Sequence, residues 1–257
     1  MKKSLIYAVL FSMCLAPVVA SAASFNFNDQ LTNPSVALVQ DRLDNFADDL
    51  GAVMVAGSYH SGKTLGFPGL DVGIHLPLLN VSDKDSIVKA SGLSYFGFPV
   101  LQLEIGLPAN LDLLVRYASV SGYASISDAS LTGYGLRYGI IRNSMPFLPN
   151  LSVQGISNTV SITAGESKIA ATSMDVSALA SFNIPIVDPY VGLGYYSSTV
   201  TPDAAIATPQ PGMKGTGTGM RIEAGLNMGL IPLTYLQLGM VYVNGGVGGV
   251  LGIGARF

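Results

Sequence analysis

Short segments in which apolar side chains alternate with polar residues or glycine dominate this sequence. The first runs LDVGIHL from Leu70 to Leu76. Successive side chains of a β-strand point to opposite faces, so each segment predicts a strand with one apolar face. The alternation recurs in nine further segments, which gives an all-β fold of about ten antiparallel strands. These segments are 101–105, 111–117, 134–140, 151–162, 172–184, 187–201, 215–229, 233–244 and 247–257.

The composition indicates what the apolar faces contact. The chain is 49% hydrophobic and 11% charged, which is too apolar for an ordinary secreted domain. Beyond residue 22, however, no apolar run reaches the roughly 20 residues that a spanning helix needs. A transmembrane up-and-down β-barrel over residues 66–257 resolves this conflict, because each strand shows lipid only alternate side chains. A soluble β-sandwich is the alternative, but its outer faces would be polar.

The connections between these segments alternate in length and composition, as those of a bacterial barrel do. We expect longer outer loops at 81–92, 121–130, 163–171 and 202–214. We expect short inner turns at 107–110, 145–150, 184–189 and 230–232, each of which contains proline. Proline cannot donate a hydrogen bond to a strand ladder and therefore ends the pairing.

The chain ends on an alternating segment, LGIGARF, whose last residue is Phe257. This ending resembles the C-terminal strand of bacterial outer-membrane β-barrels, in which a terminal aromatic residue is the signal for assembly. The resemblance implies an outer-membrane location, with membrane lipid and the barrel-assembly machinery as partners. It assigns Phe257 as the assembly signal.

Residues 1–22 have the pattern of a signal peptide. Lys2 and Lys3 precede an apolar stretch from Leu5 to Ala16, and Ala20-Ser21-Ala22 follows as a small-residue cleavage site. Cleavage would remove Cys14, the single cysteine of the chain. The mature protein would then have no disulfide and no cysteine chemistry.

One segment between the signal peptide and the barrel has helical periodicity. From Pro34 to Leu50 apolar residues recur at four-three-four spacing, with Ser35 as a candidate N-cap and Gly51 as a candidate end. We therefore assign 23–65 to a periplasmic or luminal helical segment and its connector. A helix that covers the periplasmic rim is favoured over one that plugs the lumen, because its apolar stripe is wide for a plug.

The strand register places ten charged or titratable side chains on the luminal face. The first interpretation is a network of interior ion pairs that fills a narrow barrel, since a charge facing lipid would cost several kcal/mol. The second is a polar constriction that selects solutes. These residues are Asp71, His75, Glu104, Asp112, Arg116, Arg137, Asp175, Arg221, Glu223 and Arg256.

The sequence offers little for catalysis or cofactor binding. Only His60 and His75 could supply an imidazole base, and a direct bond between Asp71 and His75 is disfavoured by about 13 Å of strand rise. We interpret His60 as a polar residue of the connector between the helix and the barrel. No close histidine pair or carboxylate-rich loop indicates a metal site, and we predict no cofactor. With a net charge of −3, no basic patch indicates a nucleic-acid partner.

Two functional hypotheses follow. The first is a passive channel or transporter for small or hydrophobic solutes, whose layout resembles that of the long-chain fatty-acid transporter group in pairing a barrel with an N-terminal segment. The second is a closed structural or interaction barrel without transport, because side chains can block a barrel of about ten strands. An outer-membrane enzyme is the least favoured alternative.

Overall fold

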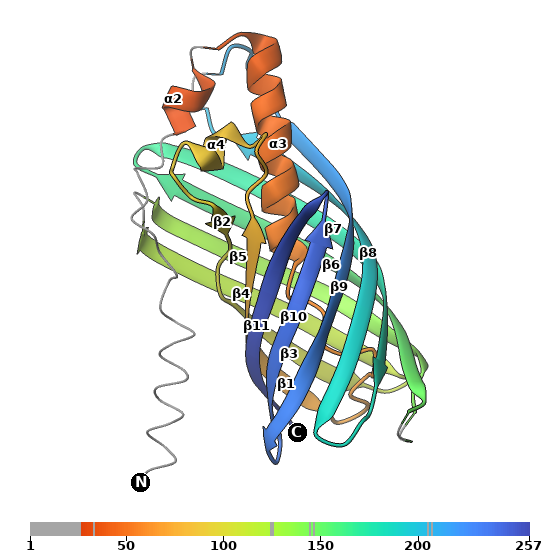
Figure 1. The fold of residues 1–257 in the computed structure, drawn as a ribbon. Helices are drawn as coiled ribbons and strands as arrows, with labels where there is room; N and C mark the ends of the chain where they lie inside the picture. The colour runs from red at the N-terminus through yellow and green to blue at the C-terminus, as the bar shows by residue number, and fades with distance from the viewer. Residues whose placement is uncertain are drawn as a thin grey trace.

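The computed structural model describes residues 27–257, apart from 33, 124, 125, 144, 146, 205 and 207. The signal peptide expected at 1–22 lies outside the described residues. The described chain forms a closed antiparallel β-barrel that encloses the lower part of a helix (Figure 1). No helix in the described residues is long and apolar enough to cross a membrane.

Ten strands close the barrel, which confirms the fold expected from the alternating pattern. Each strand pairs with its neighbours in chain order, and β1 pairs with β11 so that no edge remains open. A two-residue strand, β2 (Tyr95–Phe96), adds to the end of β1 outside this closed set. The closing strands are β1 (Leu70–Asn80), β3 (Val100–Leu107), β4 (Leu111–Tyr123), β5 (Ile126–Ile141), β6 (Pro149–Ala164), β7 (Ser167–Phe182), β8 (Val187–Pro202), β9 (Gly215–Ile231), β10 (Thr234–Val243) and β11 (Gly246–Arg256).

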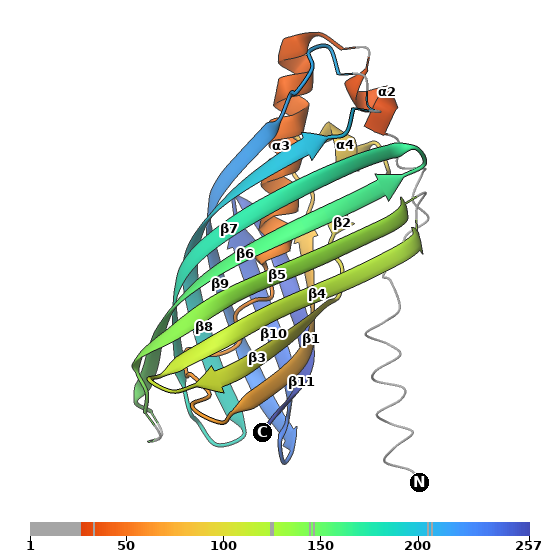
Figure 2. The same ribbon diagram turned by 180° about the vertical axis from the view of Figure 1, so that it is seen from behind.

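The outer face of the barrel is apolar and the inner face carries the polar side chains. Along β7, for example, buried and exposed residues alternate over almost the whole strand. Its outward residues include Met174 and Val176, which are 67% and 70% exposed. Such a surface would be unfavourable in water but matches a hydrocarbon environment. The long tilted strands that present it are seen from behind in Figure 2.

The two ends of the barrel differ. One end, here called the Phe257 end, holds the start of β1 and the turns at 108–110, 142–148, 183–186 and 232–233. The other, the α3 end, holds the longest connections, 81–99 and 203–214. The long loops expected at 121–130 and 163–171 are wrong, because β4 runs to Tyr123 and β5 begins at Ile126, and β6 and β7 are joined by only two residues. At the start of β7, buried Ser167 and Ile169 alternate with exposed Lys168 and Ala170, so the ladder with β6 persists there.

Three helices lie at the α3 end: α2 (Phe27–Leu31), α3 (Val36–Val55) and α4 (Ser86–Lys89). Ser35 caps α3 as expected, and its hydroxyl accepts a hydrogen bond from the Leu38 amide. The expected end at Gly51 is wrong, since the helix continues to Val55. A Cβ at Gly51 would lie 2.5 Å from Ser198 Oγ, so this glycine permits close contact with β8 rather than ending the helix.

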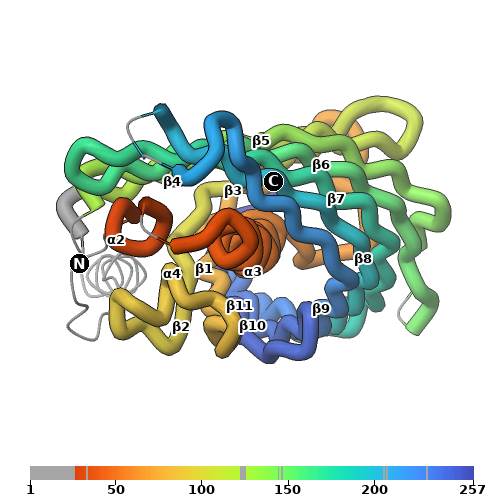
Figure 3. Tube along the Cα trace, turned by 90° about the horizontal axis from the view of Figure 1, so that it is seen from above, coloured from red at the N-terminus to blue at the C-terminus, as the bar shows by residue number. Residues whose placement is uncertain are grey.

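The position of α3 also corrects the sequence interpretation. Phe257 marks the end of the barrel that was expected to be periplasmic, and α3 lies at the opposite end (Figure 1). The helix runs down into the ring of strands, where it packs mainly on β9 and β8 (Figure 3). Leu43, Phe46 and Leu50 are fully buried there in an apolar core with strand residues such as Val160 and Val200. The helix and Phe257 therefore do not lie at the same rim of the barrel, and the periplasmic side of either stays a prediction.

Candidate functional site

The lumen below α3 is occupied by residues 56–66, here called the luminal segment. It has no regular secondary structure and connects the end of α3 to the Phe257 end, where β1 begins. Residues 56–62 are all buried. Backbone groups buried without a helix or sheet ladder must find other hydrogen-bond partners. The barrel wall supplies them.

Wall side chains donate hydrogen bonds to successive carbonyl groups of this chain. Arg116 binds the carbonyl oxygens of Met54 and Ala56 at 2.5 and 2.9 Å, and Arg221 binds that of Val55 at 2.6 Å. Further wall side chains donate to the backbone carbonyl oxygens that follow. Gln102 binds that of Ser58, Gln237 that of Tyr59, Asn227 that of His60, Arg137 that of Ser61, and Arg142 those of Thr64 and Leu65. Seven donor side chains, six from five strands and Arg142 from the turn after β5, thus hold the end of α3 and the luminal segment in place.

A group of charged side chains surrounds the lower part of the luminal segment. This Phe257-end cluster comprises Asp71, Glu104, Asp112, Arg137 and Arg256. Arg137 pairs with Glu104 and with Asp112, the latter at 2.8 Å, and Arg256 pairs with Asp71 at 2.9 Å. Apart from Arg256, whose side chain is 32% exposed, all are buried. The carboxylates are also structural acceptors, since Asp112 takes the Leu65 amide at 3.0 Å.

A second group, the central cluster, lies where α3 passes into the luminal segment. Arg221 pairs with Asp175 at 2.9 Å and with Glu223 at 3.1 Å, and its guanidinium stacks 3.6 Å from the centre of the Tyr59 ring. Arg116 completes the cluster, and its contacts are with carbonyls and with Asn158 rather than with a carboxylate. Two guanidiniums and two carboxylates therefore balance in charge around the chain.

The two histidines lie together, although the sequence indicated no close histidine pair. Their ring centres are 5.7 Å apart, and the His60 ring also stacks on Tyr235 at 5.8 Å. His75 Nδ1 is 2.6 Å from Gln237 Oε1. His60 lies in the connector between α3 and β1, where the sequence places it as a polar residue, and it is buried in the lumen. The described residues contain no group of three ligands arranged to hold a metal ion.

All ten side chains assigned to the lumen from the sequence lie on the inner face. They gather into the two clusters that surround the luminal segment, with His75 beside the first. Sequence reasoning missed Gln102, Asn227 and Gln237 as donors to this segment. Their inward register was readable from the alternating pattern, but an uncharged amide gave no reason to single them out. His60 had no periodic signal at all.

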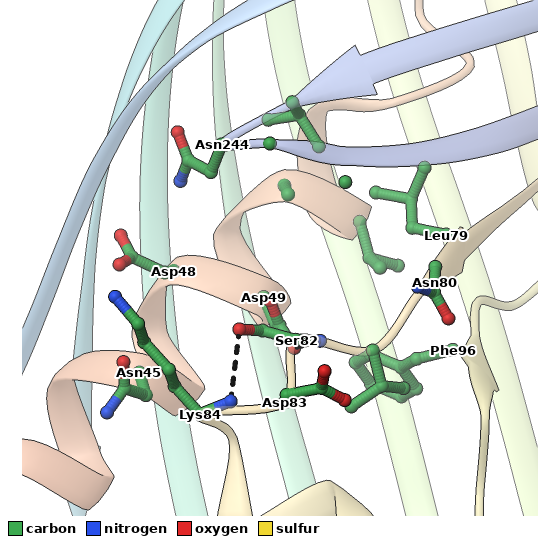
Figure 4. Close-up of a pocket in the computed structure, with 16 residues that line it drawn as sticks. Asn45, Asp48, Asp49, Leu79, Asn80, Ser82, Asp83, Lys84, Phe96 and Asn244 are labelled. Carbon is green, nitrogen blue, oxygen red and sulfur yellow. Dashed lines mark hydrogen bonds between the residues drawn. The ribbon is translucent and has the colours of Figure 1, made fainter.

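A cleft opens beside α3 at the α3 end. Its volume is about 370 Å³, and it lies between the helix, the start of the 81–99 connection and the turn between β10 and β11. Polar residues such as Asp48, Asp49 and Asn244 form its mouth, with Lys84 bonded through its amide to Ser82 Oγ (Figure 4). Apolar residues from four elements lie deeper: Ala52, Val53, Leu79, Phe96 and Val243.

The closed antiparallel barrel with an apolar exterior and a polar interior defines the class of this protein: it is an outer-membrane β-barrel. Residues 86–235, from α4 into β10, match a family described as a family of unknown function, DUF6588. The chain belongs to this family. No curated protein matches the sequence.

Solved structures similar to this chain include three outer-membrane barrels. Ail of Yersinia pestis, in complex with the heparin analogue sucrose octasulfate, is 15% identical, with 74% of this chain and 97% of that chain covered and a TM-score of 0.33. The N-terminal β-barrel domain of Pseudomonas aeruginosa OprF is 12% identical, covering 73% and 97%, with a TM-score of 0.34. The translocator domain of the autotransporter NalP from Neisseria meningitidis is 14% identical, covering 78% and 91%, with a TM-score of 0.36.

Proposed function

We propose that this protein is an occluded outer-membrane barrel that presents its N-terminal helices at the cell surface as an interaction module. The observation that supports this most strongly is the hydrogen-bonded luminal segment. Six wall side chains donate to its backbone carbonyls, and two ion clusters enclose it. In an open passive channel, water would hydrate these wall side chains and no chain segment would bind them. The closed alternative is therefore favoured over the channel that the sequence placed first.

The presentation of α2 and α3 at the surface follows from two geometric facts. Phe257 and the short turns mark one end of the barrel, and in outer-membrane barrels short turns face the periplasm. The helices lie at the other end, together with the two longest connections. Polar residues such as Asp41 and Arg42 on α3 are exposed or half-buried there, where a partner can contact them.

Single-cysteine labelling in intact cells tests this orientation. The only natural cysteine, Cys14, falls in the segment assigned to the signal peptide. We expect Asp41→Cys to react with a membrane-impermeant maleimide in intact cells. The matched control, Met145→Cys at the Phe257 end, should react only after the outer membrane is permeabilised. The reverse labelling pattern would overturn surface presentation of the helices.

Conductance in planar bilayers tests occlusion. The full chain should show no stepwise conductance at neutral pH, because the luminal segment fills the path. Replacing Arg116 and Arg221 together by alanine frees the carbonyls of residues 54–56 and should produce channel events. Large, steady conductance of the unmodified protein would contradict an occluded lumen.

Transport of a small hydrophobic solute is the second candidate, and the cleft beside α3 favours it. An apolar floor under a polar mouth suits a molecule with an apolar tail and a polar head. Binding of a fluorescent fatty-acyl probe tests this function. Ala52→Trp, which fills the floor, should abolish saturable binding, whereas Leu38→Trp on the exposed side of α3 should leave it intact. Equal binding by both variants would exclude the cleft as the entry site.

A further inference from the structure

His60 is the one residue of the luminal segment whose ring contacts carboxylates on two different strands. Its Nε2 lies 3.5 Å from Asp71 on β1, and its Nδ1 lies 3.5 Å from Glu104 on β3. Neither nitrogen has a hydrogen-bond partner, and the side chain is 1% exposed. A neutral imidazole carries one donor and can satisfy only one of these carboxylates, whereas an imidazolium donates to both.

The charges of the Phe257-end cluster lead to the same conclusion. It contains three carboxylates, those of Asp71, Glu104 and Asp112, but only the two guanidiniums of Arg137 and Arg256. One of the three carboxylates is therefore left without a cation, and an unpaired charge buried in a protein is costly. The other charged groups at this end, Lys63, Arg142 and Asp188, are half-buried or exposed, so that water screens them.

The remaining groups around His60 do not supply the missing positive charge. Gln237 donates through Nε2 to the Tyr59 carbonyl, so its Oε1 accepts from His75 Nδ1. His75 Nε2 is buried without a partner, which favours the neutral form protonated on Nδ1. Tyr235 on β10 donates its hydroxyl to Asp71 at 2.9 Å. The His60 ring stacks with the rings of both His75 and Tyr235. Of the groups that contact these carboxylates, His60 is the one that gains a donor toward both Asp71 and Glu104 by taking up a proton.

We propose that the Phe257-end cluster binds one proton on His60, and that this proton latches the luminal segment to the barrel wall. The proton comes from water and leaves one carboxylate charge unbalanced when it is lost. The segment should then be held firmly at acidic pH and loosened at alkaline pH. This proposal rests on the occluded barrel proposed above and adds the group that regulates it.

Nitrogen NMR of histidine-labelled protein tests the proton directly. The mature chain contains only His60 and His75, so two imidazoles are observed. At pH 6 we expect His60 as the imidazolium and His75 as the neutral Nδ1-protonated form. Glu104→Gln removes the excess negative charge and should leave His60 largely neutral at the same pH. A neutral His60 in the unmodified protein at pH 6, or an unchanged His60 in Glu104→Gln, would overturn the proposal.

Conductance then tests the latch. The unmodified barrel should be silent at pH 6 and show at least tenfold more channel events at pH 9. His60→Gln should conduct at both pH values, and His60→Gln with Glu104→Gln should be silent at both, because its cluster is balanced without a proton. Silence of His60→Gln at pH 6 would refute the latch. If the unmodified barrel conducts freely while NMR shows a charged His60, the occluded barrel fails and the proton site stands.

Discussion

The two halves of the lumen hold the same N-terminal chain by different forces. Toward the α3 end, Leu43, Phe46 and Leu50 are fully buried in an apolar core. Toward the Phe257 end, carboxylates, guanidiniums and amides bind individual backbone atoms. Apolar contact is non-directional and stabilises the helix against the wall, whereas hydrogen bonds fix which residue lies opposite which. The comparison indicates that the upper half supplies stability and the lower half supplies register.

Loss of one partner in the ionic half should have the largest effect. Arg137→Met leaves Glu104 and Asp112 buried without their cation, which should cost about 3–5 kcal/mol in the free energy of unfolding. The urea midpoint of the folded, heat-modifiable barrel measures this loss. A triple variant that also carries Glu104→Gln and Asp112→Asn should recover much of it. If Arg137→Met costs less than about 1 kcal/mol, the ionic half does not hold the chain as we describe.

Truncation in the apolar half should have a somewhat smaller effect. Leu50→Ala removes a fully buried side chain from α3 and should cost about 2–5 kcal/mol, without creating channel events, because the lower half still fixes the segment. Urea unfolding and planar-bilayer conductance are measured on the same preparation. Leu38→Ala is the control. Leu38 is 44% exposed, so its truncation should change the free energy of unfolding by about 0.5 kcal/mol or less. Channel opening by Leu50→Ala would remove the distinction between the halves.

The connection that covers the apolar half should respond to pH. Burial, together with the negative charge of the nearby Asp49, raises the pKa of Asp85 from its ordinary value of 3.8 to about 7. A carboxyl whose pKa is raised in the folded state favours the protonated form, so the packing of α4 should weaken as pH rises from about 4 to 7. Hydrogen exchange at the amides of Ile87 and Val88, corrected for intrinsic rates, measures this packing.

Two variants check the assignment to Asp85. Asp85→Asn keeps an acceptor for the two amides but cannot ionise, so the pH dependence should disappear. Asp83→Asn changes a carboxylate that is 98% exposed and should retain the dependence. An unchanged pH response in Asp85→Asn would assign it to another group.

The smallest effect is expected at the beginning of α3. Ser35→Ala removes the hydroxyl that accepts the Leu38 amide and should cost about 1 kcal/mol. The loss should appear as faster proteolysis near α3, with an unchanged urea midpoint for the barrel. Ser35→Asp retains the cap and should behave like the unmodified protein. A barrel destabilised by Ser35→Ala would show that the helix and the strands unfold as one unit.

Much of the barrel was predictable because its information is local. The alternation in LDVGIHL assigns faces within one strand, and prolines mark the turns at the Phe257 end. The N-cap at Ser35 was likewise readable from its neighbours. The loops expected at 121–130 and 163–171 failed because polar residues and glycine interrupt the apolar alternation there, and pairing between neighbouring strands decided the outcome.

The sequence by itself determined the strand periodicity, the inward side of each strand and the cap of α3, because each depends on residues a few positions apart. Only the tertiary structure decided that α3 continues past Gly51 into the lumen, that residues 56–66 fill the barrel, and that His60 meets Asp71 and Glu104. The contacts that set this path join distant positions, such as Arg221 with Val55 and Gln237 with Tyr59. No local pattern encodes them, since they exist only once the closed barrel brings its inner face around the chain.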